Sequence, residues 1–159
     1  MKKLLISAAV AASLVAMVPA AEAASTSGTF NVDITLTSAC SLSAITAVNF
    51  AYTSLGGAAA ATGGGFTVSC TNTLPYTFGL QSGNGAAVPP GAATISVTDD
   101  AVNLTYDLGL SAAGGTGNGA AQAYSVTGSM AALQAGTCAT ASCTNAAATN
   151  RTHTLIVNY

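Results

Sequence analysis

The stretch from residue 66 to residue 80 reads FTVSCTNTLPYTFGL. Apolar and polar side chains alternate in both halves of this stretch, and Pro75 stands before the second half, where a strand can begin. Alternation with a period of two is typical of β-strands that bury one face. We therefore expect two strands here, whose core-facing side chains are Phe66, Val68, Cys70, Tyr76, Phe78 and Leu80.

The same alternation recurs on both sides of this stretch. Glycine-rich segments at 56–65 and 109–122 are expected to be flexible connections, 81–91 is expected to be a loop, and residues 128–150 carry no readable pattern. About seven or eight short strands with glycine-rich turns predict an antiparallel β-sandwich in a single domain. The further expected strands cover residues 30–36, 48–52, 95–97, 102–108, 124–126 and 155–159.

Composition agrees with this architecture and excludes several functions. Charged residues make up 5% of the chain, which holds 3 Lys and Arg and 5 Asp and Glu. So few basic residues leave no electrostatic footprint for nucleic acid, and the scarcity of Glu, Lys and Arg argues against a coiled coil or a helical bundle. The single histidine, His153, has no recognisable nucleophile beside it. We interpret it as a solvated strand position and predict no catalytic residue and no enzyme.

The first 23 residues predict a secretory signal peptide. Lys2 and Lys3 precede an uncharged apolar run over 4–18, and Ala-Glu-Ala at 21–23 fits a cleavage site. The alternative, a transmembrane anchor, is disfavoured because a bilayer needs about 20 apolar residues. The expected mature chain keeps a single cation and four aspartates. Such a low net charge favours association.

Export and an even number of cysteines predict disulfides. Four cysteines allow three connectivities. We favour Cys40–Cys70 together with Cys138–Cys143, because the second pair would close a short local loop. The cysteines lack the spacing of a zinc site, and the adjacent Asp99 and Asp100 indicate a turn rather than a calcium site. No metal and no cofactor is therefore expected.

An ordered set of segments resembles the spore coat protein U (SCPU) domain family, which includes the subunits of archaic, Csu-type chaperone–usher pili. The resemblance extends over nearly the whole mature chain and is sharpest around Cys70 and Tyr76. Members often carry a basic residue and a methionine ahead of the Leu-x-Tyr strand, where this chain has Ile95 and Val97. The segments that carry the resemblance are ACSL at 39–42, VNF at 48–50, FTVSCT at 66–71, PYTFGL at 75–80 with GNG at 83–85, and LTYDL at 104–108.

This resemblance implies an incomplete immunoglobulin-like antiparallel sandwich that lacks its last strand. In the family, a periplasmic chaperone fills the gap with its own strand. At the outer-membrane usher, the N-terminal extension of the next subunit replaces that strand by donor-strand exchange. The resemblance also implies that Cys40–Cys70 ties the first two strands together. The implied donor-strand residues are Phe30, Val32, Ile34 and Leu36, and the implied last strand, which borders the groove, carries Leu155, Val157 and Tyr159.

The implied organisation is a signal peptide at 1–23, a donor-strand extension at 24–37 and a pilin-like sandwich at 38–159. The expected protein passes through the periplasm to a cell-surface fimbrium, where it supports surface attachment and biofilm formation. Its expected partners are a periplasmic chaperone, an outer-membrane usher and neighbouring pilus subunits.

Two alternatives stay open. Residues 30–36 could complete the chain's own sheet as an ordinary edge strand, and periodicity alone does not decide this. The protein could then be a self-complete secreted β-sandwich that binds a ligand such as a carbohydrate. The 5 Tyr and 4 Phe, however, mostly occupy alternating, core-like positions.

Overall fold

The computed structural model describes residues 24–82 and 94–159. The signal peptide expected at 1–23 and most of the loop expected at 81–91 lie outside the described residues. The described residues contain no helix, and so none that is long and apolar enough to span a bilayer. Their strands are β1 (Cys40–Leu42), β2 (Val48–Asn49), β3 (Ala59–Ala60), β4 (Thr62–Gly63), β5 (Gly65–Cys70), β6 (Pro75–Gln81), β7 (Thr94–Thr98), β8 (Thr105–Leu110), β9 (Gly114–Thr116), β10 (Gln122–Met130) and β11 (Thr154–Asn158).

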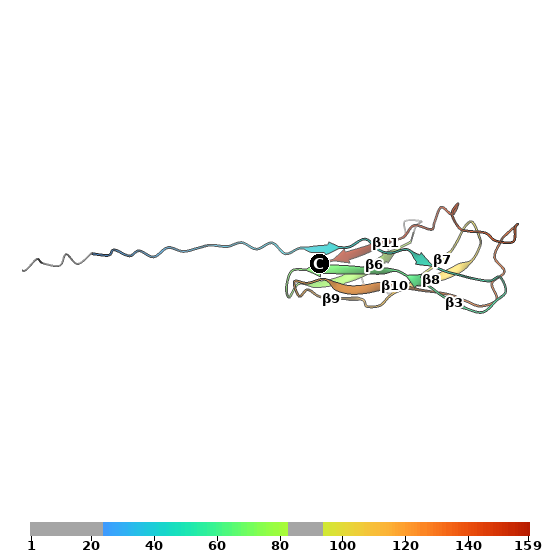
Figure 1. Ribbon diagram of the computed structural model, residues 1–159, viewed down its shortest axis with the longest axis horizontal. Coiled ribbons are helices and arrows are strands. Elements are labelled where there is room, and N and C mark those ends of the chain that lie inside the picture. Colours follow the sequence, from blue (N-terminus) through green and yellow to red (C-terminus); the bar gives the residue numbers. More distant parts are fainter. Residues whose placement is uncertain (1–23, 83–93) are drawn as a thin grey trace, which may run out of the picture. The chain divides into compact units, whose positions relative to one another are not determined.

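These strands pair antiparallel throughout (Figure 1). One sheet has the order β1-β5-β10-β8-β7, with β3 paired to β10. A second sheet has the order β11-β6-β9, and β2 and β4 form a two-stranded ribbon. One apolar core joins side chains from both larger sheets, as in a sandwich. The all-β fold predicted from the alternating segments is therefore confirmed.

The stretch over residues 66–80 forms the centre of this core. Phe66 on β5 meets Phe78 on β6 edge to face, with ring centroids 5.5 Å apart, and Phe78 also packs against Tyr124 on β10 at 4.9 Å. Aromatic pairs favour these edge-to-face arrangements and bury a large apolar area. The six predicted core side chains of this stretch are all buried.

Three hydrogen-bonded polar groups lie at the edge of the core near the start of β6. The Tyr76 and Tyr124 hydroxyls lie 2.6 Å apart, and the Tyr76 hydroxyl donates to Oε1 of Gln122 at 3.0 Å. Burial and the hydrogen bond to Tyr124 raise the pKa of Tyr76 to about 12, so its hydroxyl keeps its proton in neutral solution. Gly115 on β9 faces both hydroxyls, and a Cβ there would lie 2.7 and 2.8 Å from them. A larger residue at 115 would displace this cluster.

The glycine-rich segments hold more strand than the sequence predicts. Residues 56–65 contain β3, β4 and the first residue of β5, and residues 109–122 contain β9 and the start of β10. These short strands are defined by backbone pairing, such as Val48 with Gly63 in β2 and β4. Alanine and glycine permit such pairing without any alternation of apolar side chains, so the sequence carries no signal for it. Residues 128–150, which have no readable pattern, begin with the last part of β10.

One expected strand begins later than predicted. The alternation starts at 102, but β8 begins at Thr105. The carboxylate of Asp99 accepts hydrogen bonds from the backbone N–H groups of Ala101 and Val102 at 2.9 and 3.0 Å. This side-chain bonding holds residues 100–102 in a turn, as the two adjacent aspartates predict.

The N-terminal extension differs from the edge strand that periodicity allows. Residues 24–39 belong to no strand in the structure. The side chains of Phe30, Val32, Ile34 and Leu36 are between 71% and 86% exposed. Alternation fixes which side chains share a face, but a strand also needs a hydrogen-bonded neighbour. The strand predicted over 30–36 is therefore not formed within the described part of this chain.

Candidate functional site

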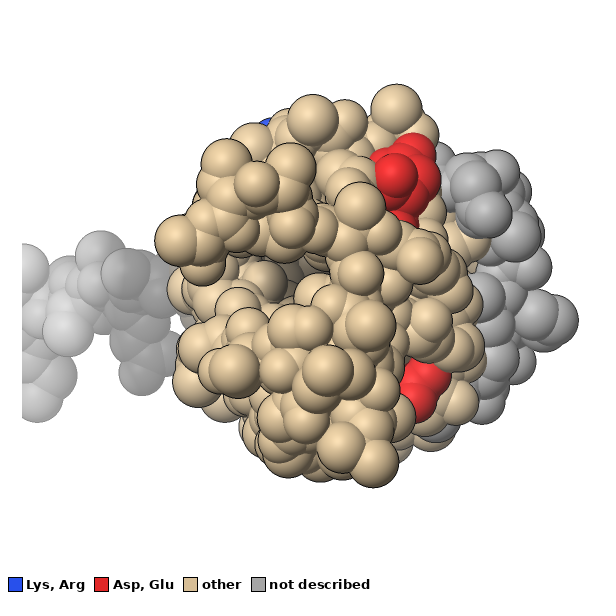
Figure 2. All heavy atoms as spheres, turned by 90° about the vertical axis from the view of Figure 1, so that its right-hand side faces the viewer, with Lys and Arg blue, Asp and Glu red and all other residues tan. Residues whose placement is uncertain are grey.

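The described residues form an open groove of about 700 Å³. One wall begins at Ile45 and ends at Tyr52, and the other is formed by residues 151–155, which lead into β11. Figure 2 shows a hollow in a surface that carries little charge. The apolar side chains that line the groove between these walls are Leu80, Val102, Leu104, Tyr106, Leu108, Val126 and Met130.

The groove lies beside a strand with a free edge. Within the described residues, β11 pairs only with β6 and is therefore the outer strand of its sheet. β1 pairs only with β5 and is likewise an outer strand. An outer strand offers a row of backbone N–H and C=O groups to any extended chain. A groove that carries apolar side chains next to such an edge can accept a strand whose side chains alternate.

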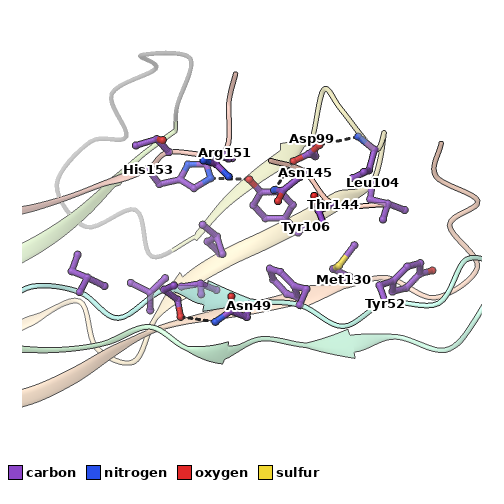
Figure 3. A pocket seen from close by; sticks show the side chains of 18 of the residues that line it. Asn49, Tyr52, Asp99, Leu104, Tyr106, Met130, Thr144, Asn145, Arg151 and His153 are labelled. Atoms are coloured by element: carbon purple, nitrogen blue, oxygen red, sulfur yellow. Dashed lines mark hydrogen bonds between the residues drawn. The ribbon is translucent and has the colours of Figure 1, made fainter. Parts of the chain in front are cut away.

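His153 forms part of the groove and is not the solvated position that the sequence predicts. Its Nε2 lies 2.8 Å from the Tyr106 hydroxyl, and the two rings pack edge to face at 5.8 Å (Figure 3). Phe50, from the opposite wall, also packs against the Tyr106 ring, with ring centroids 5.6 Å apart. Tyr106 comes from β8, 47 residues away from His153. This distance explains why the local sequence pattern around His153 gives no sign of its burial.

Burial shifts the ionisation of both groups. Desolvation lowers the pKa of His153 below its ordinary value of 6.5, although a backbone hydrogen bond with Gln81 opposes the shift. Burial, together with the nearby charges of Asp99 and Asp100, raises the pKa of Tyr106. At neutral pH the pair is therefore a neutral imidazole and a protonated hydroxyl in the lining of the groove.

This lowered pKa predicts that the protein loses stability in mild acid. The unfolded chain binds a proton on His153 near pH 6.5, while the folded chain resists it, so the free energy of unfolding falls as the pH drops below about 6.5. Thermal unfolding midpoints measured at pH 7.5, 6.0 and 5.0 should decrease. His153→Asn, which lacks a titrating group, should flatten this decrease. Equal decreases in both proteins would assign the effect to other groups.

The turn that begins at Asp99 is hydrogen-bonded to the long loop between β10 and β11, and Asp99 itself lines the groove. Asp99 is buried, and its Oδ2 accepts a hydrogen bond from Nδ2 of Asn145 at 2.8 Å. The carboxylate of Asp100 accepts one from the backbone N–H of Thr149 at 3.0 Å. Both carboxylates thus bind protein donors. No cluster of three or more His, Cys, Asp or Glu side chains that could hold a metal ion occurs in the described residues.

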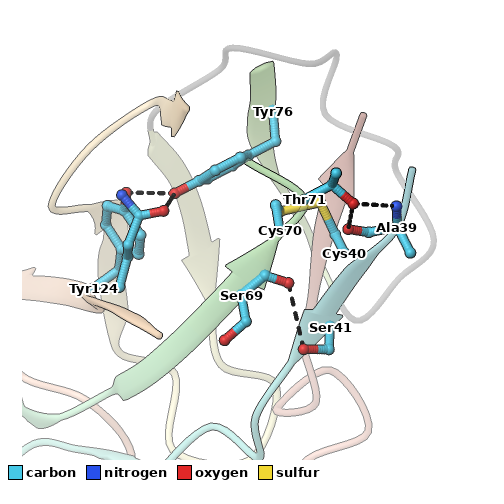
Figure 4. Close-up of a disulfide and its surroundings, with 9 residues drawn as sticks. Ala39, Cys40, Ser41, Ser69, Cys70, Thr71, Tyr76 and Tyr124 are labelled. Carbon is cyan, nitrogen blue, oxygen red and sulfur yellow. Dashed lines mark hydrogen bonds between the residues drawn. A yellow bond between two sulfur atoms is a disulfide. The ribbon is translucent and has the colours of Figure 1, made fainter. Parts of the chain in front are cut away.

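Two disulfides stabilise opposite parts of the domain. Cys40 on β1 is bonded to Cys70, its direct cross-strand partner on β5, with Cα atoms 4.1 Å apart (Figure 4). Cys138 is bonded to Cys143 within the exposed loop that the Asp99 turn holds. These are the two pairs that the sequence favours. The first of them fixes β1, and the wall that starts at Ile45 follows β1 closely in the chain.

The three residues predicted to border the groove on the last strand lie in different surroundings. Leu155 is buried and lines the groove, and Val157 packs against the core without lining the groove. Tyr159 follows β11 and is 62% exposed. Sequence reasoning missed Tyr106, Met130 and the wall that ends at Tyr52 as groove residues. The alternation of Val48, Phe50 and Tyr52 was the available signal, but it does not distinguish a groove wall from a covered core strand.

Comparison with known proteins gives one family. Searches among curated proteins and among solved structures find no match to the chain. The Spore Coat Protein U domain matches residues 26–157, which is most of the chain and includes the segment that carries Phe30, Val32, Ile34 and Leu36. This family consists of structural proteins associated with chaperone–usher pili and coats rather than of enzymes. The chain therefore belongs to the Spore Coat Protein U domain family.

Proposed function

We propose that this protein is a structural subunit of a secreted chaperone–usher pilus and that it polymerises by donor-strand exchange. The observation that carries the proposal is a complementary pair within one chain. The outer strand β11 borders a groove with a row of apolar side chains along part of its lining, and the extension, which carries four alternating apolar side chains, has no strand partner among the described residues. Each part exposes apolar surface that the other would bury.

The extension is long enough to lie along the wall from Ile45 to Tyr52. Residues 30–36 span about 23 Å as a strand, and the wall from Ile45 to Tyr52 would span about 26 Å when fully extended. Burying four apolar side chains contributes roughly 6–12 kcal/mol before the cost of ordering the chain. Backbone bonding to β11 would add to this and would cover an exposed edge. A strand of this length and pattern is therefore a suitable occupant of the groove.

The rest of the chain fits export and assembly. We propose that residues 1–23 direct the protein through the inner membrane and that residues 24–37 form the donor extension of a sandwich over 38–159. A periplasmic chaperone would cover the groove until an outer-membrane usher exchanges its strand for the extension of the next subunit. The product would be a cell-surface fimbrium that supports attachment and biofilm formation.

A charge placed on the apolar face of the extension tests this proposal. Ile34→Asp in the full exported chain should abolish the ladder of oligomers that resists SDS without heating, because a carboxylate that replaces the Ile34 side chain would lose its hydration against the apolar side chains of the groove. Thr35→Asp adds the same charge one residue away, on the polar face of the extension, and should leave the ladder intact.

An undiminished ladder from the Ile34→Asp chain would contradict donor-strand exchange through this segment. Absence of any ladder from the unaltered chain would favour the alternative, a self-complete sandwich that binds a ligand such as a carbohydrate.

A further inference from the structure

Two leucines are displayed at the surface in a conformation that leucine rarely adopts. Leu55 is 63% exposed with a φ of 60°, and Leu133 is 74% exposed with a φ of 64°. The left-handed region is disfavoured for residues with a bulky side chain. Strained backbone and exposed apolar side chains at two neighbouring positions together indicate a surface that meets a partner. We refer to Leu55 and Leu133 as the leucine pair.

The leucine pair is held rigidly. The Leu55 N–H donates to the Gln134 carbonyl at 2.8 Å, and the Leu133 N–H donates to the Gly56 carbonyl at 2.9 Å. The Gln134 side chain exchanges two hydrogen bonds with the backbone of Thr105, at 2.7 and 2.8 Å. The two loops therefore form one fixed platform at the start of β8, so a partner that binds it needs to order little besides the two leucine side chains.

This platform continues directly from the groove. The backbone N–H of Gln134 donates to the Tyr52 hydroxyl at 2.8 Å, and Tyr52 lines the groove. Figure 1 shows the loops after β2 and β10 at one end of the domain, with the start of β1 at the other. The strand registers agree, because β10 begins beside Val68, near Cys70, and ends beside Tyr106.

The opposite end of the domain also exposes an apolar side chain. β11 ends at Asn158 beside Thr77, so Tyr159 lies at the same end as Cys40 and the turn over 71–74 that leads into β6. Tyr159 is 62% exposed. We refer to Cys40, residues 71–74 and Tyr159 as the Cys40 end.

A second copy of this chain is the occupant that fits the leucine pair. Two leucines are far too little surface to hold a free partner, since stable interfaces bury about 1,200–2,000 Å². A partner already tethered through the groove is present at a high effective concentration and needs little additional surface. The proposed donor strand supplies such a tether.

The direction of the proposed donor strand brings the Cys40 end of the donating copy near the leucine pair of the accepting copy. Antiparallel pairing with β11, which continues the pattern of the sheet, puts Leu36 of the donor at the end where β11 begins. The leucine pair lies at this end. Only residues 37–39 separate Leu36 from Cys40, a reach of at most about 14 Å. The Cys40 end of the donating copy must then lie close to the leucine pair of the accepting copy.

We propose that the leucine pair of one subunit packs against the Cys40 end of the subunit that donates its strand, with Tyr159 as its main contact. This inference rests on the proposed function. It adds a second contact between neighbours, which would limit the bending of the fibre at the short link over 37–39. The two contacts are separable, because the leucine pair takes no part in lining the groove.

Photo-cross-linking in the fibre tests this contact. Benzoylphenylalanine at position 133 of the full chain, illuminated on intact cells, should give a cross-linked dimer that survives heating in SDS. Trypsin cleaves the mature chain after Arg151, so the partner peptide should begin at Thr152 and carry Tyr159. The same probe at Ser96, exposed on the outer strand β7 of the larger sheet, should give no such product.

A double variant of the leucine pair provides a second test of the proposed contact. Asparagine tolerates a positive φ better than leucine, so L55N/L133N should keep the unfolding midpoint of the domain. With the probe moved to position 159, this variant should lose the cross-linked dimer while the unheated SDS ladder stays unchanged. A normal ladder with no cross-link from 133 to the Tyr159 peptide would overturn this inference alone. Loss of the ladder from the unaltered chain would overturn the proposed function and this inference with it.

Discussion

A peptide spanning residues 25–37 is expected to stabilise the domain from which residues 24–37 have been removed. The truncated domain would expose both the free edge of β11 and the apolar groove, so it should unfold at a low temperature. Peptide at about 100 times its Kd adds about 2.7 kcal/mol to the free energy of unfolding, because it binds only the folded state. For a domain of this size, that corresponds to a rise in Tm of about 10 °C.

Thermal unfolding followed over a peptide titration measures this effect. The rise in Tm should grow with peptide concentration as mass action requires. A peptide with Ile34→Asp should produce no rise, whereas one with Thr35→Asp should act like the unaltered sequence. A truncated domain that is already stable and ignores the peptide would mean that the sandwich is closed without a donor.

The side-chain pattern predicts the core of this protein well, because the core is built from the alternation itself. Phe66 and Phe78 are predicted to face inward, and they meet across the two sheets at 5.5 Å. Cys40 and Cys70 lie directly opposite each other on β1 and β5. In both cases the contact depends only on neighbouring strands, and the sequence pattern predicts which side chains of these strands face the core.

The groove is less predictable from the sequence, because its walls come from segments that alternate like covered core strands. Phe50 and Tyr52 alternate like core residues, yet they line an open wall. The alternation at 30–36 predicts a strand just as strongly, yet this segment pairs with no strand of the described residues. Periodicity reports which face is apolar and carries no information on which chain covers it. His153 is a similar case, since its burial depends on Tyr106 from a distant strand.

The leucine pair has no signal in the sequence at all. Leu55 precedes two glycines and Leu133 follows three apolar residues, so neither position is marked as a turn that requires a positive φ. Their conformation is set by hydrogen bonds between two loops that lie far apart in the chain. Only the folded structure reveals that the two side chains share one exposed surface.

Removing the Cys40–Cys70 disulfide is expected to destabilise the domain strongly. The bond closes a loop with a sequence separation of 30, whose entropy in the unfolded chain corresponds to roughly 3–4 kcal/mol. C40A/C70A should therefore lower the free energy of unfolding, measured in denaturant under oxidising conditions, by about that amount. The matched control is C138A/C143A, which opens a separation of 5 and should cost only about 2 kcal/mol.

The two variants should also differ in assembly. Cys40 anchors β1, which has only three residues and pairs with a single strand, and the groove wall starts three residues after it ends. Without the disulfide, β1 can separate from β5, and the wall along which the proposed donor strand would lie would lose its support. C40A/C70A should consequently weaken the SDS-resistant ladder, while C138A/C143A should preserve it, because its loop is anchored independently through Asp99 and Asp100. Equal losses of stability and equal ladders would show that the Cys40–Cys70 bond has no special role in forming the groove.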